Sequence, residues 1–173
     1  MKHWLKYTAA AMIAVGSVNA AQASDKSDYE AGAKAVVASL VGGETSDIDG
    51  LIAKLDAVTA HGVALAKATA EKHQDGKTLL DFLVANIDKV KAASLESMEA
   101  DWHHGGAFKS AGIDHDSFDH YGPVIGAKDA VIHPITAAVA LKAYKEDNNE
   151  EHLEQAQEEL EEILGQLKYV DVE

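Results

Sequence analysis

The chain has 173 residues and is strongly acidic, with 15 basic residues, 29 acidic residues and a formal net charge of −14. Every basic residue is lysine. Nucleic acids and anionic lipids are disfavoured as partners, because phosphates are bound by cationic patches in which arginine makes bidentate contacts. The absence of cysteine excludes disulfides, thiolate metal sites, thiol catalysis and covalently attached c-type haem.

The first 23 residues have the pattern of a cleaved signal peptide. Lys2 and Lys6 form a basic start, residues 8–18 are mostly apolar, and Ala21-Gln22-Ala23 matches an A-x-A cleavage site. We therefore expect a periplasmic or secreted protein, with no membrane insertion after cleavage and a single domain at residues 24–173. A domain of this length can bury a sufficient hydrophobic core without disulfides.

The composition of this domain predicts helices and no strands, because alanine, leucine, glutamate and lysine dominate and proline is rare. A first, short helix is expected from Ser27 or Asp28 to about residue 41, where two glycines follow. A second is expected over 48–73, and a third over 78–104, since apolar residues recur on one face throughout each range.

The stretch 107–122 has no sustained apolar period, yet it is rich in aspartate, histidine and aromatic residues. Long connections of this kind often carry function. The residues that follow, 123–143, are nearly all small or apolar and predict the most buried helix, which Pro134 either kinks or restarts at His133.

A last helix begins near Asn148 and carries a stripe of leucines. Its many glutamates are interpreted as a solvated face; they are Glu150, Glu151, Glu154, Glu158, Glu159, Glu161 and Glu162. Together the elements predict an all-α fold: an up-and-down four-helix bundle with an additional short N-terminal helix and one long connection rich in histidine and aspartate.

Half of the histidines outside the signal peptide lie within twenty residues, 101–120. Imidazole and carboxylate groups are the ligands of Zn(II), Cu(II) and Ni(II), so this density predicts a site for a divalent transition metal. The candidate ligands are His103, His104, His115, Asp116, Asp119 and His120. The alternative interpretation is an ordinary polar loop, with the first two histidines placed favourably at a helix C-terminus.

The spacing suggests how such ligands would meet. If Asp114 caps a short helix, His115 with Asp119, and Asp116 with His120, form i,i+4 pairs. The turn at Gly105-Gly106 would fold the preceding two histidines toward them, and His133 would approach from the buried helix.

Two further interpretations remain open. His61, Met98 and His133 would be the axial ligands of a non-covalent b-type haem if they met inside the bundle. Alternatively, the acidic last helix and the histidine loop would bind a basic periplasmic protein and respond to acidification, with neighbouring carboxylates raising the pKa values of the histidines. No H-E-x-x-H, G-x-S-x-G or phosphate-binding glycine loop is present, so a binding protein is favoured over an enzyme.

Overall fold

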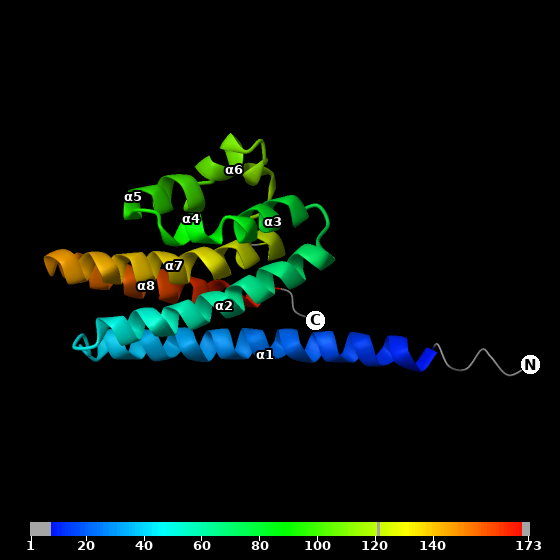
Figure 1. Cartoon of the computed structure of the whole chain (residues 1–173), viewed down its shortest axis with the longest axis horizontal. Coiled ribbons are helices and arrows are strands. Elements are labelled where there is room, and N and C mark those ends of the chain that lie inside the picture. Colours follow the sequence, from blue (N-terminus) through cyan, green and yellow to red (C-terminus); the bar gives the residue numbers. More distant parts are fainter. Residues whose placement is uncertain (1–7, 121, 171–173) are drawn as a thin grey trace, which may run out of the picture.

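The computed structural model describes residues 8–120 and 122–170, and these residues form helices and turns without a strand, as the sequence predicts. Four helices are long: α1 (Thr8–Val41), α2 (Ile48–Lys72), α7 (Pro123–Asp147) and α8 (Glu151–Gln166). Helix α1 contacts α2 and α8, and α7 contacts the same two helices. Successive long helices run in opposite directions (Figure 1).

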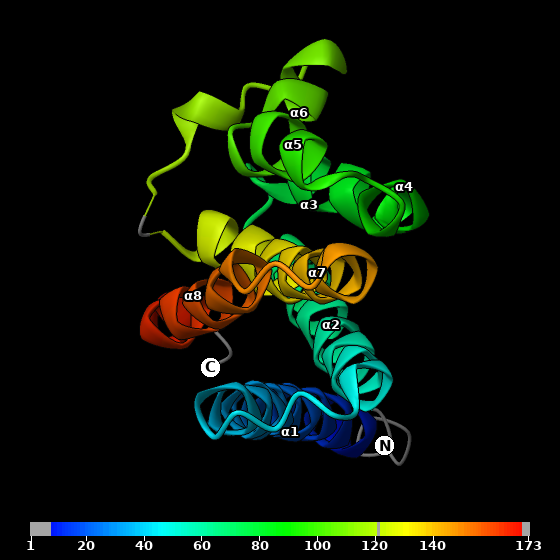
Figure 2. The same cartoon turned by 90° about the vertical axis from the view of Figure 1, so that its left-hand side faces the viewer.

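The chain between α2 and α7 is built from short pieces, and we call residues 77–117 the inserted segment. The pieces are α3 (Lys77–Ala85), α4 (Ile87–Lys91), α5 (Leu95–Ser97), the π-helix η1 (Met98–His103), α6 (Gly106–Ser110) and the 3₁₀ turn η2 (His115–Ser117). The inserted segment and α1 lie on opposite sides of α7 (Figure 2). A last 3₁₀ turn, η3 (Leu167–Tyr169), follows α8.

The single helix predicted over 78–104 is therefore wrong. Asn86 ends α3, because its side-chain amide donates to the Phe82 carbonyl oxygen at 2.8 Å in competition with the backbone ladder. Ser94 is extended, and its hydroxyl caps the next helix by accepting from the Ser97 amide at 3.2 Å. These two local hydrogen-bonding side chains divide the predicted helix into pieces.

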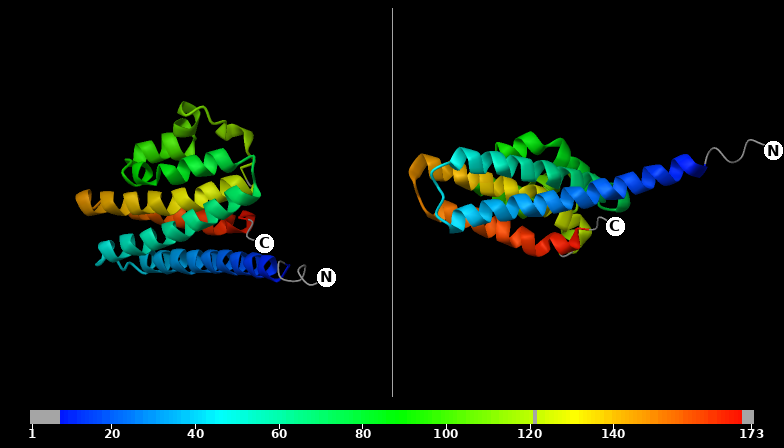
Figure 3. Two further views of the ribbon diagram at one scale, coloured as in Figure 1. Left: turned by 45° about the vertical axis from the view of Figure 1, so that its right-hand side comes forward. Right: turned by 90° about the horizontal axis from the view of Figure 1, so that it is seen from below.

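The first helix also differs from its prediction, since α1 begins at Thr8 and runs through the expected cleavage site without a break. Its N-terminal half extends beyond the other helices (Figure 3). Among residues 23–41 of this helix, Tyr29, Ala33 and Val36 are buried in the core. Lys2 and Lys6, the basic start of the expected signal peptide, lie outside the described residues.

Two hydrophobic clusters share α7. One joins α1, α2, α7 and α8, and the other joins α2 and α7 to the inserted segment. Every residue of α7 from Val124 to Leu141 is buried, so the prediction of a most buried helix is confirmed. In the described part of the chain α7 alone is long and apolar enough to cross a membrane, yet 94% of that apolar stretch is buried inside the protein.

Helix α7 continues through Pro134. Proline has no amide hydrogen, so the carbonyl oxygen of Ala130, four residues earlier, loses its intrahelical donor. That oxygen faces Gly62 of α2, where an added Cβ would lie only 2.1 Å away. Glycine at position 62 therefore lets α2 approach the backbone of α7 closely.

Candidate metal centre

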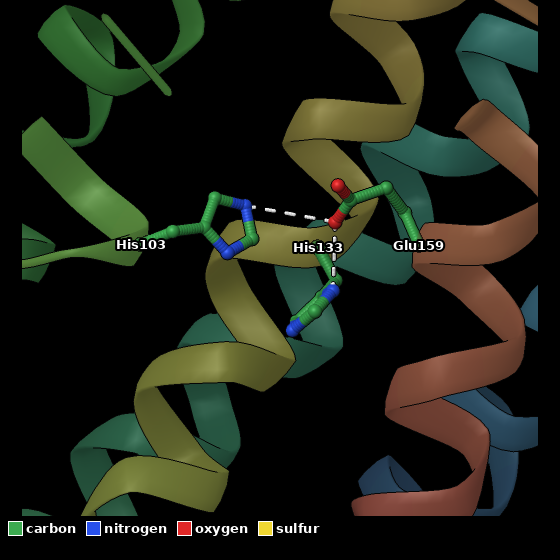
Figure 4. A group of neighbouring side chains, drawn as sticks. All are labelled: His103, His133 and Glu159. Carbon is green, nitrogen blue, oxygen red and sulfur yellow. Dashed lines mark ion pairs between the residues drawn. The ribbon is translucent and has the colours of Figure 1, made fainter. Parts of the chain in front are cut away.

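Three side chains from three different segments meet beside α7: His103 at the end of η1, His133 on α7 and Glu159 on α8 (Figure 4). Nδ1 of His133 lies 2.7 Å from Oε2 of Glu159, and Nε2 of His103 lies 3.6 Å from the same oxygen. The two imidazole rings are nearly perpendicular, with centroids 4.9 Å apart. One potential ligand atom from each residue lies within 4.8 Å of the others.

These distances are close to those of a metal site. Ligand atoms about 2.0–2.2 Å from a tetrahedral zinc ion lie roughly 3.3 Å from one another. The ligand atoms of His133 and Glu159, 2.7 Å apart, are closer than this, and those of His103 and Glu159, 3.6 Å apart, are slightly farther from each other. All three potential ligand atoms lie within 4.8 Å of one another. Small adjustments of the side chains would let all three residues bind one ion.

The centre is largely withdrawn from water. The His133 side chain is 4% exposed, and those of His103 and Glu159 are 14% and 13% exposed. Nδ1 of His133 and Oε2 of Glu159 lie 2.7 Å apart, which is the distance of a buried ion pair when the ring is protonated. Neither buried atom has another hydrogen-bond partner among the described residues. A metal ion that displaced the proton of this pair would contact both atoms.

The orientation of His103 is set by its neighbours. Met98 and Trp102 of η1 are buried in the hydrophobic cluster of the inserted segment, which anchors the π-helix. Nε2 of His103 lies 2.9 Å from the Thr136 hydroxyl, which donates its own hydrogen to the Ile132 carbonyl oxygen. The hydroxyl therefore accepts from His103, and metal binding through this nitrogen would replace that hydrogen bond.

The two histidines of the centre differ in their electrostatics. Burial lowers the pKa of His103 to about 4, against the opposing effect of Glu159. Burial also acts to lower the pKa of His133, but the carboxylates of Glu159, Asp129 and Glu162 outweigh it and raise that pKa. His103 is thus neutral at neutral pH, which is the form of imidazole that binds metals.

The expected upward shift of the loop histidines is therefore wrong for two of them. The pKa of His103 is lowered as described, and burial with the nearby Lys128 ammonium also lowers the pKa of His115, although Asp116 opposes the shift. Carboxylates near these rings do not compensate for the loss of water. With a pKa of about 4, His103 does not change its charge between pH 6 and 7.

A pocket of about 320 Å³ adjoins the centre and collects most of the predicted ligands. It is lined by Glu99, His103, His104, His115, Asp116, His120, Lys128, Asp129, His133 and Glu162. Of the six residues predicted as ligands, Asp119 is the one that does not line it. The inserted segment and the connection after it thus fold back over α7, as the turn at Gly105-Gly106 suggested.

The predicted pairing of these residues is wrong in detail. η2 is a single 3₁₀ turn, and Asp114 makes no side-chain cap, so the short helix needed for the two i,i+4 pairs is not formed. His115 instead contacts its neighbour Asp116 at 3.2 Å and stacks on the Phe108 ring. His104 is exposed and pairs with Glu99 at 2.9 Å.

The three residues of the haem hypothesis lie in three different environments. His61 contacts Asp25 of α1 at 2.9 Å, Met98 is packed in the hydrophobic cluster of the inserted segment, and His133 faces Glu159. The pocket that His133 lines includes neither His61 nor Met98. The pocket that His133 lines is rich in charged side chains, whereas cofactor sites are mostly apolar.

Sequence reasoning missed Glu159 and the Lys128–Asp129 pair. Glu159 was interpreted as part of a solvated face, but it lies three residues after Ala156 and four before Ile163, both fully buried. Its place on the core stripe of α8 was the available signal. Asp129 precedes His133 by four residues and so shares its face of α7.

No protein-family model, curated protein or solved structure matches this chain. The functional interpretation therefore depends on the geometry of the site.

Proposed function

We propose that this protein binds one divalent transition-metal ion through His103, His133 and Glu159, as a carrier, buffer or sensor of that ion rather than as an enzyme. The observation that carries the proposal is the convergence of two imidazoles and one carboxylate from η1, α7 and α8 within 4.8 Å. A set of two nitrogens and one oxygen suits Zn(II), Cu(II) and Ni(II).

The burial of the group supports this proposal. Holding a carboxylate and two imidazoles away from water is costly unless their polar atoms are satisfied. A metal ion that replaced the proton of the His133–Glu159 pair would be bound by both of these buried atoms. His104 and His120, which line the same pocket, would lie on the route by which the ion reaches the centre.

Equilibrium dialysis of the purified protein against Zn(II), Cu(II) or Ni(II) tests the proposal. We expect about one bound ion per chain, and we expect Glu159→Gln to weaken binding by more than the roughly 10- to 100-fold that outer-shell substitutions cost. Glu158→Gln is the matched control, because Glu158 is the preceding residue of α8 and is exposed.

A second pair of variants tests the imidazole ligands. His103→Gln is expected to lose the ion, whereas His152→Gln removes a histidine that also contacts a carboxylate, Asp147 at 3.2 Å, away from the pocket. The proposal is wrong if the protein binds no stoichiometric ion, or if Glu159→Gln and His103→Gln bind as tightly as their controls.

We also propose that residues 1–23 are removed on export and that the protein works in the periplasm. The A-x-A site before Ser24 supports the cleavage. Fractionation of the native cells with intact-mass measurement tests it. A cytoplasmic protein that retains residue 1 would contradict it.

For the fold, we propose an up-and-down four-helix bundle made of α1, α2, α7 and α8. The cyclic contacts of these helices and their alternating directions support it. The inserted segment would then be an elaboration between the second and third helices of the bundle.

A further inference from the structure

The inner wall of the pocket contains a buried cation of the protein itself. Lys128 is 3% exposed, and its Nζ lies 3.0 Å from Oδ1 of the equally buried Asp129. The same nitrogen donates to the backbone carbonyl oxygen of His103 at 3.2 Å and contacts Nε2 of His115 at 3.2 Å.

The three groups around this ammonium are an imidazole nitrogen, a carboxylate oxygen and a carbonyl oxygen. The first two are donor types that divalent transition metals accept. The distances of 3.0–3.2 Å are those of hydrogen bonds, about 1 Å longer than metal–ligand bonds. The ammonium thus lies where a second cation would be surrounded by donors.

This position is adjacent to the proposed centre. Asp129 and His133 are four residues apart and project from one face of α7, and His103 contributes its side chain to the centre and its carbonyl oxygen to the ammonium. Both groups border the same pocket.

We propose that Lys128 is a built-in cation that fills a second metal position and restricts the protein to a single bound ion. The inference rests on the proposed function, because it concerns the number of ions that the same pocket holds. Two effects combine. The ammonium engages the lone pair of His115 Nε2, and its positive charge repels a further cation.

The contacts of His115 explain why its Nε2 is the atom that Lys128 engages. Its Nδ1 lies 3.2 Å from the Asp116 carboxylate, to which only a protonated ring nitrogen can donate, and its ring is stacked on Phe108. A neutral imidazole protonated at Nδ1 presents a lone pair at Nε2. Lys128 occupies that lone pair, so His115 is withheld from metal ions as long as Lys128 is present.

Measuring Zn(II) stoichiometry in Lys128→Ala tests the inference. Removing the ammonium and its volume is expected to raise the stoichiometry from about one to about two ions per chain, with the second bound by His115 and Asp129. Lys128→Leu is the matched control, because it removes the charge but fills the space, and it should stay near one. Lys128→Ala with Asp129→Asn lacks the carboxylate and should also stay near one.

The outcomes separate the two proposals. A wild-type protein that binds no ion refutes the proposed function, and the inference falls with it. A wild-type protein with one ion and a folded Lys128→Ala variant that also binds one ion overturns the inference alone. Circular dichroism establishes whether the variant is folded.

A measurement on an otherwise unaltered chain decides the matter if Lys128→Ala does not fold. His115→Ala is expected to leave the stoichiometry unchanged and the affinity within about threefold, because the imidazole nitrogen that it removes is already engaged by Lys128. Loss of the bound ion in His115→Ala would identify His115 as a ligand beside the ammonium, and would overturn the inference.

Discussion

Two regions of the molecule share an apolar sequence pattern but differ in backbone structure. One region consists of the long helices α2, α7 and α8, and the other is the inserted segment. In α2 and α8 the apolar period coincides with a continuous backbone helix, in α7 a continuous apolar stretch does, and all three predicted helices are present. In the inserted segment the apolar period continues while the helix does not, because Leu80, Leu83, Val90, Met98 and Trp102 are all buried although three separate pieces, α3, α4 and η1, carry them. Apolar periodicity therefore reports which side chains are buried, and not whether the backbone between them is continuous.

The difference matters for the candidate site, which lies where the two regions meet. His133 and Glu159 come from long helices, whereas His103 comes from the π-helix of the inserted segment. π-Helical turns are rare and are often found at functional sites. The long helices supply two of the three residues of the candidate centre, and the inserted segment supplies the third, together with five of the ten residues that line the pocket.

The largest effect is expected where two long helices touch through backbone. Gly62→Ala would place a Cβ 2.1 Å from the Ala130 carbonyl oxygen, so α2 and α7 must separate. We expect a loss of about 3 kcal/mol in the free energy of unfolding, measured with urea. Gly165→Ala in α8 is the control, because its Cβ would meet nothing within 4 Å, and it should gain up to about 1 kcal/mol. Equal effects of the two variants would refute the close contact.

A smaller and more local effect is expected in the inserted segment. Gly105 has a φ of +81°, and an added Cβ would lie 2.7 Å from the His115 ring. Gly112 has a φ of +76° but open space around it. We expect Gly105→Ala to cost about 2 kcal/mol and Gly112→Ala about 1 kcal/mol, since backbone strain is common to both. NMR should show the His115 resonances shifted in Gly105→Ala alone, and shifts in both would argue against this contact.

Helix caps allow the two regions to be compared with one kind of substitution. Asp47 caps α2 by accepting from the Gly50 amide at 2.9 Å, and Ser94 caps α5 by accepting from the Ser97 amide at 3.2 Å. Replacing either with alanine should cost about 1 kcal/mol. By amide hydrogen exchange, Asp47→Ala should lower protection throughout the long helices, and Ser94→Ala mainly over residues 95–103. A global loss in both variants would mean that the two regions unfold as one unit.

The sequence predicted the fold class and the region of the pocket correctly, but it did not predict which side chains contact each other there. It indicated the all-α class, the buried α7 and a histidine-rich pocket whose lining includes five of the six predicted ligands. It did not predict the breaks at Asn86 and Ser94, because side-chain hydrogen bonds to the backbone leave the apolar pattern intact. Glu159 was missed because it lies in a run of glutamates, which resembles solvated surface, although its spacing from Ala156 and Ile163 places it on the core stripe of α8.

The smallest effect on the free energy of unfolding is expected from Tyr29→Phe, which removes one buried hydroxyl from the core. The side chain is fully buried, and its hydroxyl has no hydrogen-bond partner among the residues described. Burial, aided by the negative charge of Asp129, raises the pKa of Tyr29 well above its usual value near 10. As the pH rises above about 10 the unfolded chain ionises first, so the stability that this residue contributes is complete below that pH and is lost above it.

Tyr29→Phe should therefore gain up to about 1 kcal/mol at pH 7 by removing an unpaired hydroxyl. Its advantage in urea unfolding should widen by at most about 1.4 kcal/mol per pH unit above pH 10. Tyr144→Phe, a substitution at a partly buried tyrosine beside the same core, is the control. An advantage of Tyr29→Phe that stays constant between pH 7 and 11 would show that the Tyr29 hydroxyl reaches water.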